Sequence, residues 1–241
     1  MKKKSSIWMH AATNLALVFL LFSITIVCFM PMEDGQATST EVAEGVYRNA
    51  SSSSDGVSLM FNVYWGTEEV EKILDVLDDF GAKCTFFVGG CWADDNVATL
   101  KKIVQKGHEI GNHGYFHKDH TTLGEKENKK EISTCNEFVY LATGSMPTLF
   151  APPSGAYNDL TIKVARSLGM STILWSKDTI DWRDKDEAMT ISRATKNVKG
   201  GDFVLMHPMQ ATVAALDDIL SYYKKEGLRV ITVTENLQLG G

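Results

Sequence analysis

Val-Ser-Leu-Met-Phe-Asn-Val, the run at residues 57–63, is mostly apolar and predicts a buried β-strand. An amphipathic window at 67–80 follows it, in which Val70, Ile73 and Leu74 fall on one helical face and charged residues are left for water. A glycine then ends the helix, and a second buried run begins at residue 84. The order strand, helix, strand predicts a βαβ unit with parallel strands.

The same alternation continues to the end of the chain. It places helices at 96–106, 126–143, 160–168 and 212–225, and strands at 84–88, 109–112, 149–150, 171–175, 203–206 and 229–232. We therefore expect one α/β domain on a parallel sheet, over residues 55–241, without internal repeats. Polar motifs directly follow several strands, and in parallel barrels that edge carries the active site.

The first 54 residues have a different character. Three lysines at positions 2–4 precede an apolar segment, 15–32, which would span roughly 27 Å as a helix at about 1.5 Å per residue. Because two acidic residues follow it, the positive-inside rule predicts a cytoplasmic N-terminus at 1–14 and an exported domain. We expect an uncleaved membrane anchor and a flexible linker at 33–54. A small-residue site at 35–37 offers cleavage and secretion as the alternative.

Charge and cysteine content exclude several classes. The net charge is −6 and no basic run follows the N-terminus, so we expect no nucleic-acid partner. Of four cysteines, Cys28 lies in the predicted span, which leaves Cys84, Cys91 and Cys135 without a C-x-x-C pair. We expect these thiols to be buried as small apolar groups, with one Cys84–Cys91 bridge as the alternative.

Three imidazoles and a carboxylate follow predicted strands. His113 and His117 are four residues apart, so one helical turn would point both rings the same way, as a two-histidine metal site requires. That spacing is also typical of surface or capping histidines. His207 ends the strand at 203–206, in a position fit for general-acid work. Asp181 follows another strand, where it can hold the ring N–H of a histidine or cap the next helix.

These motifs, in this order, resemble the polysaccharide deacetylase domain of the NodB-homology type, carbohydrate esterase family four, over roughly residues 55–239. The resemblance extends to Lys-Cys-Thr-Phe-Phe-Val at 83–88, Gly-His-Glu-Ile-Gly-Asn-His at 107–113 and Ala-Pro-Pro-Ser-Gly at 151–155. It implies an irregular TIM-like (β/α) barrel. It also implies removal of N-acetyl groups from a cell-wall N-acetylglucosamine polymer, either peptidoglycan or chitin-like. The run at 62–66 looks like a membrane-anchored subgroup from spore-forming bacteria that is associated with sporulation.

The family resemblance also assigns roles to residues. In that family one aspartate and two histidines hold a divalent metal, usually zinc, which activates a water. A second aspartate, paired with an arginine, takes the proton of that water, and a histidine steered by a carboxylate protonates the departing amine. The resemblance carries metal binding to His113 and His117, the general-acid role to His207 and the steering role to Asp181. Substrate contacts fall on Tyr64, Trp65, Pro153, Tyr157, Trp182 and Leu205.

Three positions depart from the family pattern. Asn62 stands at the position of the base, Val63 at that of the metal aspartate and Ala151 at that of the arginine. An amide cannot accept a proton at neutral pH and an isopropyl group cannot bind zinc. Loss of the general base alone lowers a rate by about 10²–10⁴. The losses are mutually consistent, because an arginine facing Asn62 would be a charge without a partner.

Three functions are compatible with this pattern. The first is a weak deacetylase whose metal is held by the histidine pair, with His120, Asp119 or water in the vacant position. The second is a catalytically inactive homologue that binds glycan, or a partner in wall assembly or sporulation, through the aromatic groove. The third is a hydrolase of another amide that uses His207 and Asp181 without a metal.

Overall fold

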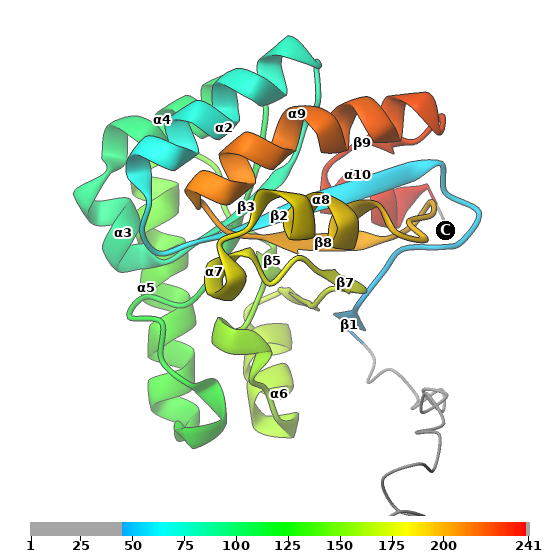
Figure 1. Ribbon diagram of the computed structural model, residues 1–241. Coiled ribbons are helices and arrows are strands. Elements are labelled where there is room, and N and C mark those ends of the chain that lie inside the picture. The colour runs from blue at the N-terminus through cyan, green and yellow to red at the C-terminus, as the bar shows by residue number, and fades with distance from the viewer. Residues whose placement is uncertain (1–44, 240–241) are drawn as a thin grey trace, which may run out of the picture. The chain divides into compact units, whose positions relative to one another are not determined.

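A curled sheet of parallel strands forms the centre of the computed structural model, which describes residues 45–239 (Figure 1). Its strands within that range are β1 (Val46–Tyr47), β2 (Gly56–Val63), β3 (Thr85–Val88), β4 (Glu109–Asn112), β5 (Leu149–Phe150), β6 (Ser171–Ile173), β7 (Lys177–Asp178), β8 (Phe203–Met206) and β9 (Arg229–Val230). They follow the order β1-β6-β5-β4-β3-β2-β8-β7, with β9 paired to β2. The sheet curls without closing, because its two end strands do not pair. The predicted parallel α/β fold is confirmed, as an open half-barrel.

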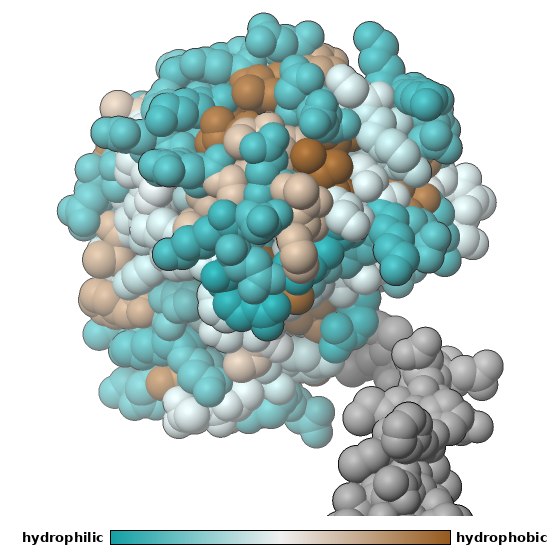
Figure 2. Space-filling model, in the orientation of Figure 1, coloured by the Kyte–Doolittle hydropathy of each residue, from teal (hydrophilic) through white to brown (hydrophobic). Residues whose placement is uncertain are grey.

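Helices connect the strands and cover the sheet. They are α2 (Thr67–Asp79), α3 (Gly90–Asp95), α4 (Val97–Gln105), α5 (Glu125–Thr143), α6 (Asp159–Ser167), α7 (Asp181–Asp184), α8 (Glu187–Thr195), α9 (Gln210–Lys225) and α10 (Val233–Gln238), with short 3-10 turns η1 (His120–Thr122) and η2 (Pro153–Gly155). In Figure 1 helices α2, α4 and α9 lie side by side over one face of the sheet. Figure 2 shows that polar residues cover most of the face in view, with small groups of apolar residues among them.

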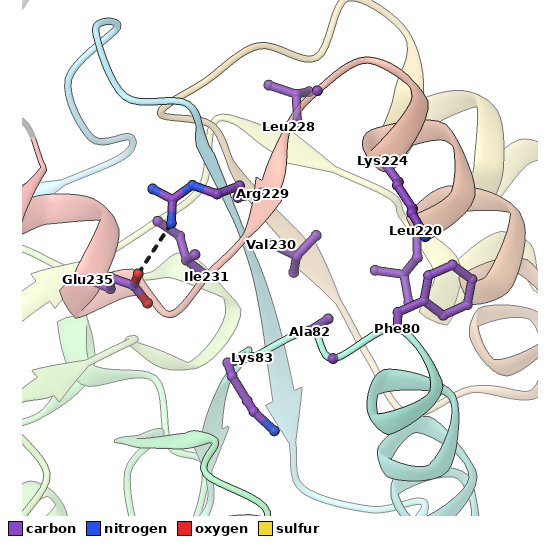
Figure 3. A pocket seen from close by; sticks show the side chains of 12 residues that line it. Phe80, Ala82, Lys83, Leu220, Lys224, Leu228, Arg229, Val230, Ile231 and Glu235 are labelled. Atoms are coloured by element: carbon purple, nitrogen blue, oxygen red, sulfur yellow. Dashed lines mark ion pairs between the residues drawn. The ribbon is translucent and has the colours of Figure 1, made fainter.

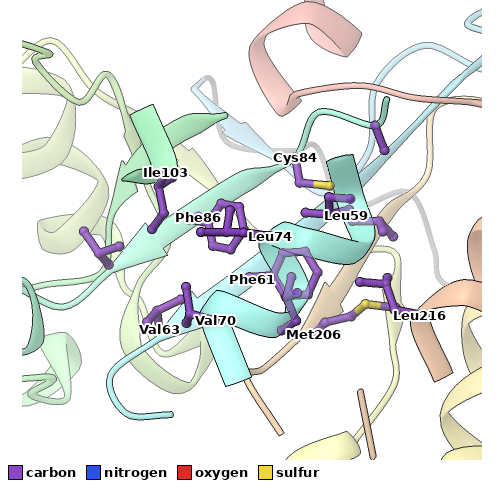
Figure 4. Close-up of a cluster of buried hydrophobic side chains, with 14 of the residues drawn as sticks. Leu59, Phe61, Val63, Val70, Leu74, Cys84, Phe86, Ile103, Met206 and Leu216 are labelled. Atoms are coloured by element: carbon purple, nitrogen blue, oxygen red, sulfur yellow. The ribbon is translucent and has the colours of Figure 1, made fainter. Parts of the chain in front are cut away.

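Strand β2 separates the two sides of the sheet residue by residue. Because successive side chains in a strand point to opposite faces, Phe61 and Val63 enter the large apolar core under the helices, whereas Met60 belongs to a smaller cluster on the other face. Figure 4 shows the large core, where the rings of Phe61 and Phe86 stack with centroids 5.0 Å apart. Asn62 therefore points away from that core, and Val63 points into it.

The domain begins earlier than the sequence predicted. Residues 45–54, the last part of the expected linker, are folded: β1 pairs with β6, and the amide of Ala50 donates to the carbonyl of Gly201 at 2.8 Å. The hydroxyl of Ser54 donates to Asn236 Oδ1 at 2.6 Å. Hydrogen bonds to distant strands and helices thus order a segment whose composition alone indicates flexibility.

The other N-terminal predictions lie outside the described residues. These are the cytoplasmic N-terminus at 1–14, the membrane span at 15–32 and residues 33–44 of the linker. Over 45–239, no helix has both the length and the apolar character needed to cross a membrane.

The cysteines of the described domain are free thiols. Cys84 and Cys135 are buried, and burial raises the pKa of Cys135 to about 12. The expectation of buried, unpaired thiols is confirmed for these two residues, and the alternative bridge between Cys84 and Cys91 is not formed.

Candidate active site

The carboxyl ends of the parallel strands gather the motifs around one cavity. Its volume is about 360 Å³. It is lined by Asn62, Trp65, His113, His117, Ser154, Trp175, Asp178, Trp182, Leu205 and His207. These residues follow or end β2, β4, β5, β6, β7 and β8, so parallel strand order alone brings distant parts of the sequence together.

His207 is held by the buried carboxylate of Asp181, as the sequence predicted. Asp181 is 1% exposed, and its Oδ1 lies 2.8 Å from Nδ1 of the imidazole. Its Oδ2 accepts the backbone N–H of His207 at 2.7 Å and the hydroxyl of Thr212 at 2.6 Å. Because a carboxylate only accepts, Nδ1 must carry the proton. The other ring nitrogen, Nε2, is left for the cavity, where it accepts a proton in the neutral ring and donates one when the ring is an imidazolium.

His113 and His117 lie side by side in a loop. Their ring centroids are 4.9 Å apart. The expected helical turn is wrong: β4 ends at Asn112, and the loop reaches His117 through left-handed backbone, with φ of 71° at Gly114 and 53° at His117. Nδ1 of His113 donates to the carbonyl of Ala151 at 2.7 Å, which leaves Nε2 as an acceptor.

Burial keeps both of these imidazoles neutral. It lowers the pKa of His113 to about 3, and it also lowers the pKa of His117. Desolvation has this effect because it disfavours the charged form of a histidine. A neutral imidazole is the form that binds metal ions.

Glu131 fixes the histidine loop, and sequence reasoning missed it. This side chain of α5 is 4% exposed, and its Oε2 accepts the backbone N–H groups of Tyr115 at 3.1 Å and Phe116 at 2.8 Å. Its Oε1 lies 3.0 Å from Nζ of Lys118. An available signal was an acidic residue on the face of a helix that otherwise carries Ile132 and other buried side chains.

The two positions at which the family has the general base and the metal-binding aspartate are altered in this chain. Asn62 is 4% exposed and lines the cavity, and its Oδ1 has no hydrogen-bond partner among the described residues. Val63 is fully buried in the large core, near Val70, and does not line the cavity (Figure 4). Within 45–239, no three His, Cys, Asp or Glu side chains are grouped so as to hold a metal ion. The residues present therefore do not fit a site of two histidines and one aspartate.

The proposed substitutes for the missing ligand lie elsewhere. His120 is fully buried, its ring packs on Phe150 at 5.0 Å, and its Nδ1 contacts Oδ1 of Asn128. Asp119 accepts the N–H of Thr121 at the start of η1. Neither residue lines the cavity, because each is engaged in holding the turn between the histidine loop and α5.

Aromatic side chains flank the cavity. Trp65 is 43% exposed, and its ring lies parallel to that of His207, with an interplanar angle of 2° and centroids 6.0 Å apart. Trp182 is 48% exposed on another side. Of the other predicted substrate contacts, Leu205 lines the cavity, whereas three do not: Tyr64, Pro153 and Tyr157.

Each of these three has another role in the structure. The ring of Tyr64 packs on His117 at 4.9 Å, and the hydroxyl of Tyr157 accepts from Arg48 at 3.3 Å. Pro153 is buried at the start of η2.

A larger hollow lies away from this site. It has a volume of about 570 Å³ and lies near the amino ends of β3 and β9, on the opposite edge of the sheet from the motifs. Figure 3 shows its lining residues and the ion pair between Arg229 and Glu235 beside it. None of the predicted site residues lines it, so chemistry and not size identifies the candidate site.

Comparison with known proteins places the chain in a family of polysaccharide deacetylases. The sequence model described as "Polysaccharide deacetylase" matches residues 49–173. "Uncharacterized protein YlxY" of Bacillus subtilis (strain 168) is 37% identical over 179 residues, which cover 74% of this chain and 56% of that protein. A "Peptidoglycan-N-acetylglucosamine deacetylase" of Bacillus cereus is 35% identical over 173 residues, which cover 69% of this chain and 81% of that protein. The chain thus spans little more than half of the first relative.

Solved structures agree in fold. The structure of BA3943, described as "a CE4 family pseudoenzyme from Bacillus Anthracis", superimposes with a TM-score of 0.78 at 35% identity and covers 80% of this chain and 68% of that chain. A mutant of BA3943 described as having "restored enzymatic activity" superimposes with the same TM-score at 33% identity, covering 80% and 71%.

Proposed function

The chain belongs to the polysaccharide deacetylase family, and from that premise we propose that it acts on N-acetylated sugars of a bacterial cell-wall glycan. The proposed reaction is hydrolysis of the amide C–N bond, which releases acetate and leaves an amine on the sugar. One observation carries the proposal: His207, held by Asp181, faces the same cavity as His113 and His117. A relative named as a peptidoglycan deacetylase supports the class of substrate.

His207 supplies the proton that the departing amine requires. As the C–N bond breaks, the nitrogen gains a proton, and a positioned imidazolium provides it through Nε2. Asp181 keeps the opposite nitrogen protonated and fixes the ring in one orientation. Trp65 and Trp182 offer half-exposed ring faces on which the apolar faces of a sugar pack, which orients the amide toward His207.

The attack of water on the amide carbonyl is slow in this chain. Asn62 orients a water molecule but does not accept its proton, so general-base assistance is lost, at a cost of about 10²–10⁴ in rate. The family is generally metal-dependent, and zinc is the ion that His113 and His117, as neutral imidazoles, would hold. The buried Val63 stands at the position of the third ligand, the metal aspartate, so the residues present do not fit the family's metal site. No step above depends on a metal.

A second function, glycan binding without turnover, is favoured by a separate observation. Val63 packs in the apolar core and has no route to the cavity. The cavity and its tryptophan walls are nevertheless intact, and the similar Bacillus anthracis structure is described as a pseudoenzyme. In this reading the glycan, or a wall-assembly or sporulation partner, occupies the cavity.

Acetate release and glycan binding, measured on the same preparations, distinguish the two functions. Our proposal predicts slow acetate release from N-acetylated peptidoglycan, none from His207→Ala, and a gain of about 10² in Asn62→Asp, which returns a base to the cavity. Binding without acetate release in any of the three proteins would establish the second function. Absence of both would contradict both functions. Elemental analysis of wild type, His113→Ala and His117→Ala reports separately whether the pair holds zinc.

We also propose a location for this activity. The domain works outside the cell, tethered to the membrane by the apolar segment at 15–32, in keeping with the lysines that precede it. Its role in sporulation is proposed on the resemblance of the run at 62–66. Protease treatment of intact cells tests the location: degradation of the domain supports it, and protection contradicts it.

A further inference from the structure

A second hollow lies beside the candidate active site. Its volume is about 350 Å³, and it is lined by Trp65, Glu69, Lys185, Pro208, Met209 and Gln210 with one alanine. Trp65 lines both hollows and so forms the wall between them. The volume is at the lower end of the range of about 300–1,000 Å³ that is usual for ligand pockets. The two hollows are therefore neighbours on either side of this indole.

Two side-chain contacts position the shared wall. The indole N–H of Trp65 contacts Sδ of Met209 at 3.4 Å, and its ring lies parallel to that of His207. Below it, Gly66 has a φ of 75°, and a Cβ at that position would lie 2.5 Å from the carbonyl oxygen of Pro208. Only glycine permits this approach of the start of α2 to the loop before α9. The hollow is consequently preformed next to the proton donor.

Two unpaired charges of opposite sign line the hollow. Glu69 is half-buried and Lys185 is exposed, and neither makes an ion pair or side-chain hydrogen bond with any residue of 45–239. Gln210 adds an amide, which both donates and accepts. A ligand that matches all three groups carries a carboxylate, an ammonium group and peptide-like amides. A chitin-like polymer, which is uncharged, uses none of the charges.

We propose that this hollow binds the peptide branch of a peptide-bearing glycan, with a ligand carboxylate at Lys185 and a ligand ammonium group at Glu69. The inference rests on the proposed function, because it extends the substrate of the same cavity. It selects peptidoglycan over a chitin-like polymer as the substrate class.

The test compares two probes on the full-length chain. One probe is a peptidoglycan disaccharide that carries its peptide, and the other is the same disaccharide after the peptide has been removed. Calorimetry gives the ratio of the two dissociation constants for wild type and for Lys185→Glu, Glu69→Lys and the double exchange. Lys129→Glu, an exposed charge reversal on α5, is the matched control.

We expect wild type and Lys129→Glu to prefer the peptide-bearing disaccharide by up to about 25-fold, which is about fivefold for each of the two partly screened ion pairs. Each single exchange should bring the ratio to about one. A ratio of one in wild type, or a preference that survives both single exchanges, overturns this inference and leaves the proposed function standing. Binding of neither disaccharide overturns the inference and the proposed function together.

Discussion

Replacement of Glu131 by alanine should loosen the loop that carries His117. The carboxylate accepts two backbone N–H groups, of Tyr115 and Phe116, and pairs with the half-exposed Lys118. A buried donor that loses its acceptor costs about 1–3 kcal/mol, and a half-exposed ion pair contributes about 1 kcal/mol or less. Because Phe116 is itself 52% exposed, water replaces part of the loss. We therefore expect destabilisation of about 3 kcal/mol for Glu131→Ala.

Two measurements separate a local effect from a global one. Urea unfolding gives the change in the free energy of unfolding, and amide hydrogen exchange reports the protection of residues 115–117. Glu137→Ala is the matched control, because this glutamate is exposed on the same helix and makes no ion pair with the described residues. It should change the stability by less than about 0.5 kcal/mol. Equal stability and equal exchange in the two variants would refute the role that we assign to Glu131.

Three further predictions concern the proton donor, the core and a buried histidine. Asp181→Asn should lower acetate release by about 10² or more at unchanged glycan affinity, because His207 loses the carboxylate that orients it; an unchanged rate would exclude His207 as the proton donor. Val63→Asp should lower the free energy of unfolding by about 3–5 kcal/mol, because it places an unpaired charge in the core. Urea unfolding checks this against the control Val63→Thr, which should lower the free energy of unfolding by less. Burial lowers the pKa of His108 from 6.5 to about 4, so between these values the unfolded chain binds more protons and stability falls as the pH falls. The loss should reach about 3 kcal/mol or less, and a His108→Gln protein with the same pH slope would show the explanation to be wrong.

Amphipathic periodicity predicted the main helices closely. The window at 67–80 became α2 (Thr67–Asp79) and that at 126–143 became α5 (Glu125–Thr143), because in both the buried residues recur at helical spacing. Helix α8 was missed, since only Thr190 and Ala194 are buried in it and neither is a strong apolar signal. Strand β1 was missed because two residues carry no detectable period.

The candidate site was predictable where the fold rule alone places residues. Asn62 lies at the end of β2, and His113 and His207 directly follow β4 and β8, so parallel order brings them to one edge. The predictions that failed were those that depend on loop geometry or on contacts between residues far apart in the sequence. The helical turn expected between His113 and His117 is a loop, and Glu131 supports that loop from another helix. The residues that a buried side chain contacts are set by the packing of the whole domain. The spacing of residues along the sequence carries little information about these contacts.

The hydrogen bond from His113 to residue 151 uses the main-chain carbonyl. Any residue type supplies the same oxygen, so the side chain at this position can be exchanged during evolution while the tautomer of His113 is kept. The arginine of active family members and the alanine of this chain are therefore interchangeable as far as the histidine is concerned. A change of side chain at residue 151 therefore alters the charge at this position without disturbing the hydrogen bond that fixes the tautomer of His113.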